Sequence, residues 1–203
     1  MKVAEAVYKR RSMRSFTQKA ISNEVLAELV DGARVGPSAG NRQPLEYIAV
    51  NEPGLCAQLF DCLKWAMYTA PKGTPAPGAR PTAYVVVLRR GDTVLGDTAL
   101  YDVGAALQTM CLMAEEKGLG SCWIKTVNFP KVREIFAVPE GIEIDCVLAL
   151  GHPAEEPKQV DLKPDQTGLE VIRYWRDENN QQFVPKRALA SILFYQKYGE
   201  RKG

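Results

Sequence analysis

Apolar residues repeated every three or four positions predict the helices of this chain. The predicted helices are residues 2–10, a helix from Ser22 to Gly36-Pro37, residues 54–68, residues 98–117, a short helix from Pro130, and residues 188–198. Ser22 and Asp97 are suitable N-caps, and Gly118 suits a helix C-terminus. Leu100 should belong to the apolar stripe of helix 98–117.

Runs rich in β-branched residues predict strands at 46–50, 83–88 and 144–151. The last two runs are almost uninterrupted, so we expect them to be buried on both faces of a sheet. The Pro/Gly-rich stretch 69–82 is a loop, either a lid over a site or a passive connection. Helices and strands mix along the whole chain, which predicts an α+β fold in one domain, residues 1–203.

The C-terminal tail, about residues 170–203, has an unusual pattern. It reads as a strand, a turn at Asn179-Asn180 and a returning strand before the last helix. Its aromatic residues Tyr174, Trp175 and Phe183 would be exposed unless something covers them. A tail of this kind often wraps a partner subunit.

Charge is concentrated near the start of the chain, where "YKRRSMRSF" has four basic residues and no acidic one. Such a run suits a nucleic acid, a membrane surface or one tightly bound small anion. The net charge is only +2, whereas a nucleic-acid-binding protein more often has a basic excess overall. No apolar run is long enough for a membrane span, and no secretory signal precedes the first helix, so we expect a cytoplasmic protein.

Several classes of catalytic site have no sequence signature here. The five cysteines form no C-x-x-C pair and read as reduced, buried thiols, and the single histidine, His152, reads as a structural loop residue. We therefore expect no metal site. There is no Rossmann fingerprint, P-loop or nucleophile elbow. If the chain is an enzyme, its chemistry should belong to a bound cofactor and not to a catalytic side chain.

Four short motifs remain as candidate binding elements. They are "RRSMR" at 10–14, "GPSAGNRQP" at 36–44, "GLGSCWI" at 118–124 and "VPKR" at 184–187. Arginines and a serine can grip a phosphate, but cations at a helix C-terminus explain the first motif equally well. The second alone is more often a plain turn, and the third alone is a helix stop. Lys186 and Arg187 would open the last helix, where a bound phosphate would offset their unfavourable position.

The order and spacing of these motifs, with "VLALGHPAEEP" at 147–157, closely resemble the FMN-dependent nitroreductase family. The resemblance covers roughly residues 3–157 and, less surely, 184–198. It implies an α/β sandwich with a central, mostly antiparallel sheet flanked by helices, in an intertwined homodimer. FMN would lie at the dimer interface and contact both chains.

The resemblance also assigns the cofactor-binding positions. Arg10, Arg11 and Ser12 match residues around the phosphate and ribityl chain, and Arg14 matches a basic residue near the N1/O2 edge of the flavin. The other matching positions are Pro37, Ser38 and Ala39 from the other subunit, Asn41 and Gln43 in the same turn, Trp123, Ile124 and Lys125 beside the ring, and Lys186 and Arg187 at the phosphate. Lys125 and Thr126 depart from the glycine or glutamate-glycine of many relatives, which puts the substrate side of the ring in doubt.

The implied activity is a ping-pong transfer of hydride from NADH or NADPH, through flavin N5, to small acceptors such as nitroaromatics or quinones. An alternative is an FMN-binding protein without reductase turnover, such as a flavin store or sensor. A nucleic-acid-binding module using the basic N-terminus is a third reading, which the near-neutral net charge disfavours.

Overall fold

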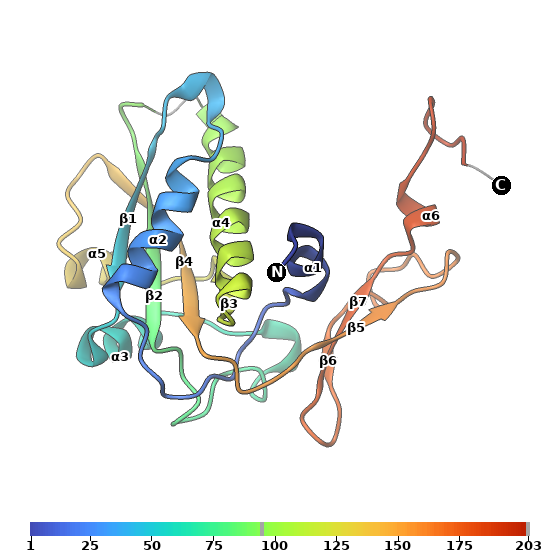
Figure 1. Ribbon diagram of the computed structural model, residues 1–203, viewed down its shortest axis with the longest axis horizontal. Coiled ribbons are helices and arrows are strands. Elements are labelled where there is room, and N and C mark those ends of the chain that lie inside the picture. Colours follow the sequence, from blue (N-terminus) through green and yellow to red (C-terminus); the bar gives the residue numbers. More distant parts are fainter. Residues whose placement is uncertain (94–95, 202–203) are drawn as a thin grey trace. The chain divides into compact units, whose positions relative to one another are not determined.

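The computed structural model describes residues 1–93 and 96–201, which form two compact units (Figure 1). The larger unit comprises Met1–Trp65 and Thr74–Glu155, and the smaller one comprises Ala66–Gly73 and Glu156–Gly203. The single domain expected over 1–203 includes positions 94–95 and 202–203, which lie outside the described residues. That expectation stays a prediction.

A four-stranded antiparallel sheet forms the centre of the larger unit. The strands lie in the order β1 (Leu45–Val50), β2 (Ala83–Arg90), β4 (Ile142–Gly151) and β3 (Gly120–Ile124). Each neighbouring pair is antiparallel, and the register between β2 and β4 shifts at Val87/Leu88. The fully buried residues of β2 and β4 confirm that these near-continuous apolar runs are inner strands.

Helices α2 (Asn23–Arg34) and α4 (Ala99–Glu116) pack on one face of this sheet (Figure 1). The core on this side includes Leu26 and Leu29 of α2, Leu107 and Met110 of α4, and Val85 of β2. The Ser22 hydroxyl accepts the Val25 N–H at 3.4 Å, which confirms it as an N-cap. Gly118 has φ +70° just after α4, as a helix-ending glycine should.

Three shorter helices complete the larger unit: α1 (Val3–Lys9), which packs against α4, α3 (Pro53–Asp61) and α5 (Phe129–Ile135). Single 3-10 turns occur at Ala39–Asn41 and Gly96–Thr98. The Asn128 side chain caps α5 by accepting the Lys131 N–H at 3.3 Å, and Pro130 lies in its first turn. The predicted α+β fold class is confirmed, and no helix among the described residues is long and apolar enough to span a bilayer.

Three predictions about the helices are wrong. Asp97 lies in the 3-10 turn before α4 and does not cap the helix, whose N-cap is Thr98. Leu100 is 49% exposed and therefore lies outside the buried stripe. Helix α3 stops at Asp61 instead of 68, and the chain turns at Ala66, whose φ is +36°.

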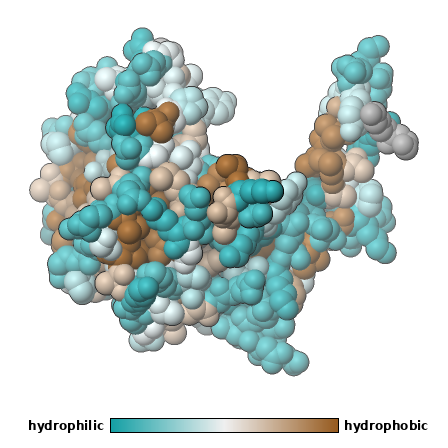
Figure 2. Space-filling view, viewed as in Figure 1, coloured by the Kyte–Doolittle hydropathy of each residue, from teal (hydrophilic) through white to brown (hydrophobic). Residues whose placement is uncertain are grey.

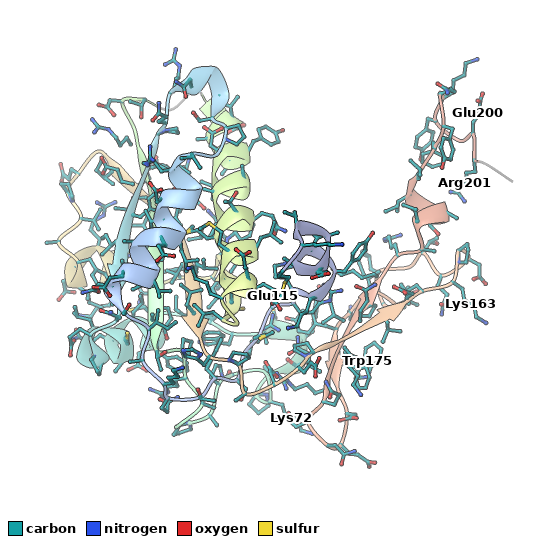
Figure 3. All side chains as sticks on the ribbon, viewed as in Figure 1. Lys72, Glu115, Lys163, Trp175, Glu200 and Arg201 are labelled. Atoms are coloured by element: carbon teal, nitrogen blue, oxygen red, sulfur yellow. The ribbon has the colours of Figure 1, made fainter. Side chains whose placement is uncertain are left out.

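The smaller unit contains a three-stranded sheet in the order β5 (Lys158–Asp161), β7 (Gln182–Lys186), β6 (Trp175–Arg176). The β6–β7 hairpin is the predicted one: Asn180 has φ +60° and donates its N–H to Asp177 at 3.1 Å. Trp175 stacks on Phe183 with ring centroids 5.2 Å apart (Figure 3). The parallel pairing of β5 with β7 was not predicted.

The end of the chain is mostly not helical. The smaller unit also contains a 3-10 turn at Met67–Thr69. The predicted helix 188–198 is wrong in length, because α6 covers only Leu189–Ile192. Leu189 and Ile192 are exposed, so these side chains are not packed against the other described residues and do not support a longer helix. Figure 2 shows hydrophobic side chains of this kind at the surface of the smaller unit.

Candidate functional site

The basic N-terminal motif lies beside strand β3. Ser12 forms a parallel bridge with Ser121, and the Met13 N–H donates to the Ser121 carbonyl at 2.9 Å. Gly120 permits this approach, because a Cβ there would lie 2.6 Å from the Met13 sulfur. The fold therefore brings together two motifs that are about one hundred residues apart in the sequence.

The arginines of this motif have different surroundings. The Arg11 guanidinium is buried and donates to the carbonyls of Tyr8, at 2.8 Å, and Arg10, so it satisfies the C-terminal end of α1. The Arg14 N–H donates to the Glu155 carboxylate. The Arg10 Nε is buried and has no hydrogen-bond partner among the described residues. The Arg14 Nε is buried in the same way, so Arg10 and Arg14 each have a guanidinium Nε donor without a hydrogen-bond partner among the described residues, on either side of half-buried Ser12.

At the end of β3, successive side chains point alternately to solvent and to the core. Trp123 is 47% exposed, whereas Ile124 is buried, so only the backbone of Ile124 can contact a ligand. The Lys125 ammonium donates to the carboxylate of Asp145 at 2.8 Å and to its carbonyl at 2.9 Å. Asp145 also pairs with Arg89 at 3.0 Å. The charge of Lys125 is thus compensated by a buried carboxylate.

The second motif forms a tight turn after α2. The Ser38 hydroxyl accepts the Gln43 N–H, and Asp102 of α4 accepts the Ala39 N–H, both at 3.0 Å. Asn41 and Gln43 both have positive φ, and the Gln43 amide donates to the Asn41 side chain at 3.3 Å. Pro37, Ser38, Gln43 and Asp102 line part of a cavity of about 130 Å³.

Helix α4 separates the turn from the basic motif. Asp102 holds the turn near the start of the helix, and Glu115 pairs with Lys9 of α1 at 3.4 Å near its end (Figure 3). At 1.5 Å of rise per residue, the two carboxylates are roughly 20 Å apart along the axis. One chain therefore does not bring the turn and the basic motif to the same point.

The late basic residues lie in the smaller unit. Lys186 is the last residue of β7, and its carbonyl accepts the Leu162 N–H at 2.9 Å. Arg187 follows it. The expectation that both residues open the last helix is wrong, because α6 begins at Leu189 and has only four residues. No helix dipole can act at their position.

Sequence reasoning missed three buried carboxylates: Asp102, Glu115 and Asp145. Asp102 and Asp145 interrupt otherwise apolar stretches of a helix and a strand, whereas Glu115 begins the charged run 115–117. Interruption was the available signal for Asp102 and Asp145, since a buried carboxylate needs a specific partner. Asp102 accepts from the turn after α2, and Glu115 pairs with Lys9 of helix α1. Asp145 pairs with both Arg89 and Lys125.

Burial dominates the titration of several groups in and beside the four-stranded sheet. It raises the pKa of the Cys146 thiol, with Asp145 adding to the effect. It also raises the pKa of Tyr47 to about 12, with a smaller contribution from Cys146. Burial lowers the pKa of His152, and Lys19 lowers it further. These groups are neutral near pH 7.

Within 1–93 and 96–201, no group of three or more His, Cys, Asp or Glu residues is arranged to hold a metal ion.

Comparison with known proteins identifies the family. The family model for nitroreductases matches residues 7–152, which is most of the chain and includes the basic motif, the turn and β3. The chain belongs to the nitroreductase family. The predicted family resemblance is therefore confirmed.

Individual nitroreductase-family proteins give the same picture. A Methanothermobacter thermautotrophicus protein assigned as NADH dehydrogenase/NAD(P)H nitroreductase is 29% identical over 175 residues, covering 84% of this chain and 87% of the relative. A nitroreductase family protein from Clostridium novyi has a TM-score of 0.65 at 25% identity, covering 75% and 87% of the two chains. A nitroreductase from Desulfovibrio desulfuricans, solved with FMN, has a TM-score of 0.60 at 22% identity, covering 84% and 94%.

Proposed function

We propose that this nitroreductase-family protein is an FMN-dependent oxidoreductase that uses NADH or NADPH to reduce small conjugated acceptors such as nitroaromatics or quinones. The observation that carries the proposal is the placement of Arg10–Arg14 along β3, within the region that the family model matches. The names of the relatives supply the redox class.

The residues present fit FMN. Arg10 supplies a buried donor without a partner among the described residues, as a phosphate requires. The half-exposed Trp123 and the backbone of 123–125 form the neighbouring surface on which a flat ring can lie. Ser12 lies between these two elements through its bridge to Ser121.

A complete site requires a second copy of the chain. The turn containing Pro37, Ser38 and Ala39 is anchored at the opposite end of α4 from the basic motif, so a single FMN can contact both only if they come from different protomers. We propose a homodimer in which the tail, about residues 170–203, covers the partner. Its exposed apolar side chains support this arrangement: Trp175, Leu189, Ile192, Leu193, Tyr195 and Tyr198.

The protein's own groups would bind, orient and set charge. When bound, FMN would supply hydride transfer from NADH or NADPH to an acceptor that enters the same place after the nicotinamide leaves. Arg14 would place a cation beside the ring edge where negative charge develops. Asp145 holds the Lys125 ammonium and so keeps a free cation away from the acceptor side.

An anaerobic visible spectrum tests the proposal. We expect the purified protein to show a flavin spectrum that NADH or NADPH bleaches, and the faster donor identifies the natural one. Arg14→Ala should weaken flavin binding or reduction. A flavin spectrum that stays oxidised with both donors would contradict reductase turnover and favour a flavin store or sensor. No flavin binding after addition of FMN would contradict the proposal altogether.

A further inference from the structure

Another cavity in the larger unit is lined by none of the residues assigned to the flavin. It has a volume of about 260 Å³ and is formed by helix α3, the segment around Gln18 and the entry to β2. Its walls include Pro53, Phe60 and Pro81 as apolar surfaces and Arg80 as the charged group. We call it the α3 cavity. Its size suits a small organic molecule.

Arg80 is a cation with no ion-pair partner in the described part of the chain. Its guanidinium carbon lies 4.0 Å from the centroid of the Phe60 ring, so the group is stacked on an aromatic face. Its Nε is buried, and its side chain makes no hydrogen bond or ion pair with residues 1–93 or 96–201. Partial burial of an arginine without such partners is costly, and an anion in the cavity would remove that cost.

The position of Arg80 is fixed by its neighbours. The Gln18 side-chain amide donates to the Arg80 carbonyl at 3.1 Å. The Ala79 carbonyl, just before Arg80, accepts the Phe16 N–H at 3.1 Å. The Thr82 hydroxyl donates to the Lys19 carbonyl at 3.0 Å. The backbone on both sides of Arg80 is therefore held in place, and the Phe60 ring supports its guanidinium, which reduces the entropy lost on binding.

A buried hydroxyl lies near the same group. Tyr84 is fully buried, and its hydroxyl has no hydrogen-bond partner among the described residues. Burial raises the pKa of Tyr84, Cys56 and Asp61 raise it further, and Arg80 acts in the opposite direction. The hydroxyl is therefore protonated near pH 7, behind a cavity wall that includes Cys56 and Arg80.

We propose that the α3 cavity binds a small organic carboxylate with an apolar body. The two carboxylate oxygens match the planar donor fork of Arg80. The hydrocarbon part would pack against Phe60, Pro53 and Pro81. These apolar walls favour a carboxylate with a hydrocarbon part over inorganic phosphate.

Phenylacetate is a suitable probe, with the uncharged phenylacetamide as its control. Calorimetric titration of the purified full-length protein should show phenylacetate binding, and Arg80→Gln should weaken it at least tenfold. Ala57→Phe, an exposed position at the rim, should block the cavity and cause a similar loss without removing the charge. Arg173→Gln is the matched control, because Arg173 also lies over an aromatic ring, Tyr68, in the smaller unit. It should bind phenylacetate like the wild type.

The Nε–H signal of Arg80 in a ¹⁵N spectrum provides a second readout, and phenylacetate should shift it. The proposal is overturned if the wild type does not bind phenylacetate. It is equally overturned if Arg80→Gln and Ala57→Phe bind it as tightly as the wild type, since the ligand would then lie elsewhere, including the flavin site. Comparable binding of phenylacetamide would also contradict the carboxylate contact.

Discussion

Asp102 and Glu115 are buried carboxylates on the same helix, and each fixes a different motif of the family. Asp102 accepts the Ala39 N–H at 3.0 Å, and Glu115 pairs with Lys9 at 3.4 Å, directly before the basic motif. Their separation along α4, roughly 20 Å, is too large for one phosphate or one ring to contact both motifs in a single chain. The separation is the structural basis for proposing a site shared between two protomers.

The Asp102 contact should control the turn 36–44, which we propose to bind flavin in the partner's site. Asp102→Ala removes the acceptor of the Ala39 N–H, and we expect the dissociation constant for FMN to rise about tenfold, as for loss of one hydrogen bond to a charged group. Fluorescence titration with FMN measures it. Asp102→Asn keeps an acceptor oxygen and should bind FMN nearly as well as the wild type. Unchanged affinity in the alanine variant would show that the turn does not depend on this carboxylate.

The two cations paired with Asp145, Arg89 and Lys125, should contribute unequally to the free energy of unfolding. Asp145→Ala removes the buried partner of Arg89 and leaves it paired with the more exposed Glu143 at 2.8 Å, so we expect the free energy of unfolding to fall by about 2 kcal/mol. Lys125→Met should cost less than about 1 kcal/mol, because Lys125 is 58% exposed and Arg89 keeps its pair with Asp145. Urea unfolding measures both. Equal losses in the two variants would contradict this account of the cluster.

Strands β2 and β4 were predictable because they are buried on both faces, which leaves a simple apolar run in the sequence. Ser22 and Gly118 were also predictable, since each satisfies backbone groups within its own helix. Residues 188–198 were not, because their apolar spacing resembles a helix although no surface among residues 1–93 and 96–201 buries it. Local pattern does not reveal which apolar face finds a partner.

The candidate site was predictable as a set of motifs and not as a geometry. Arg11 illustrates the limit: it belongs to the family motif, yet its guanidinium binds the carbonyls at the end of α1. Lys125 pairs with Asp145, which lies on another strand, twenty residues later. Contacts of this kind depend on strand order and register, which the sequence pattern does not specify.

The cysteines should react slowly in the native protein. All five are buried, and burial, with Glu52 nearby, raises the pKa of Cys56 to about 11. A raised pKa keeps the thiol protonated at pH 8, so the native protein should react with a disulfide reagent only slowly, and faster as the pH approaches 11. Five thiols should react at once in urea. A rapid reaction of several thiols in native protein at pH 8 would contradict this prediction.

Subunit complementation tests the shared site most directly. Ser38→Trp should block the turn contributed to the partner's site, and Arg14→Ala should damage the basic motif, so each variant alone should bind little flavin. When the two variants are unfolded, mixed equally and refolded, hybrid dimers should contain one site built from an intact turn and an intact basic motif. Random pairing predicts recovery of about a quarter of the wild-type flavin content and reductase activity. No recovery, in a mixture shown to contain hybrid dimers, would contradict a site formed by two chains.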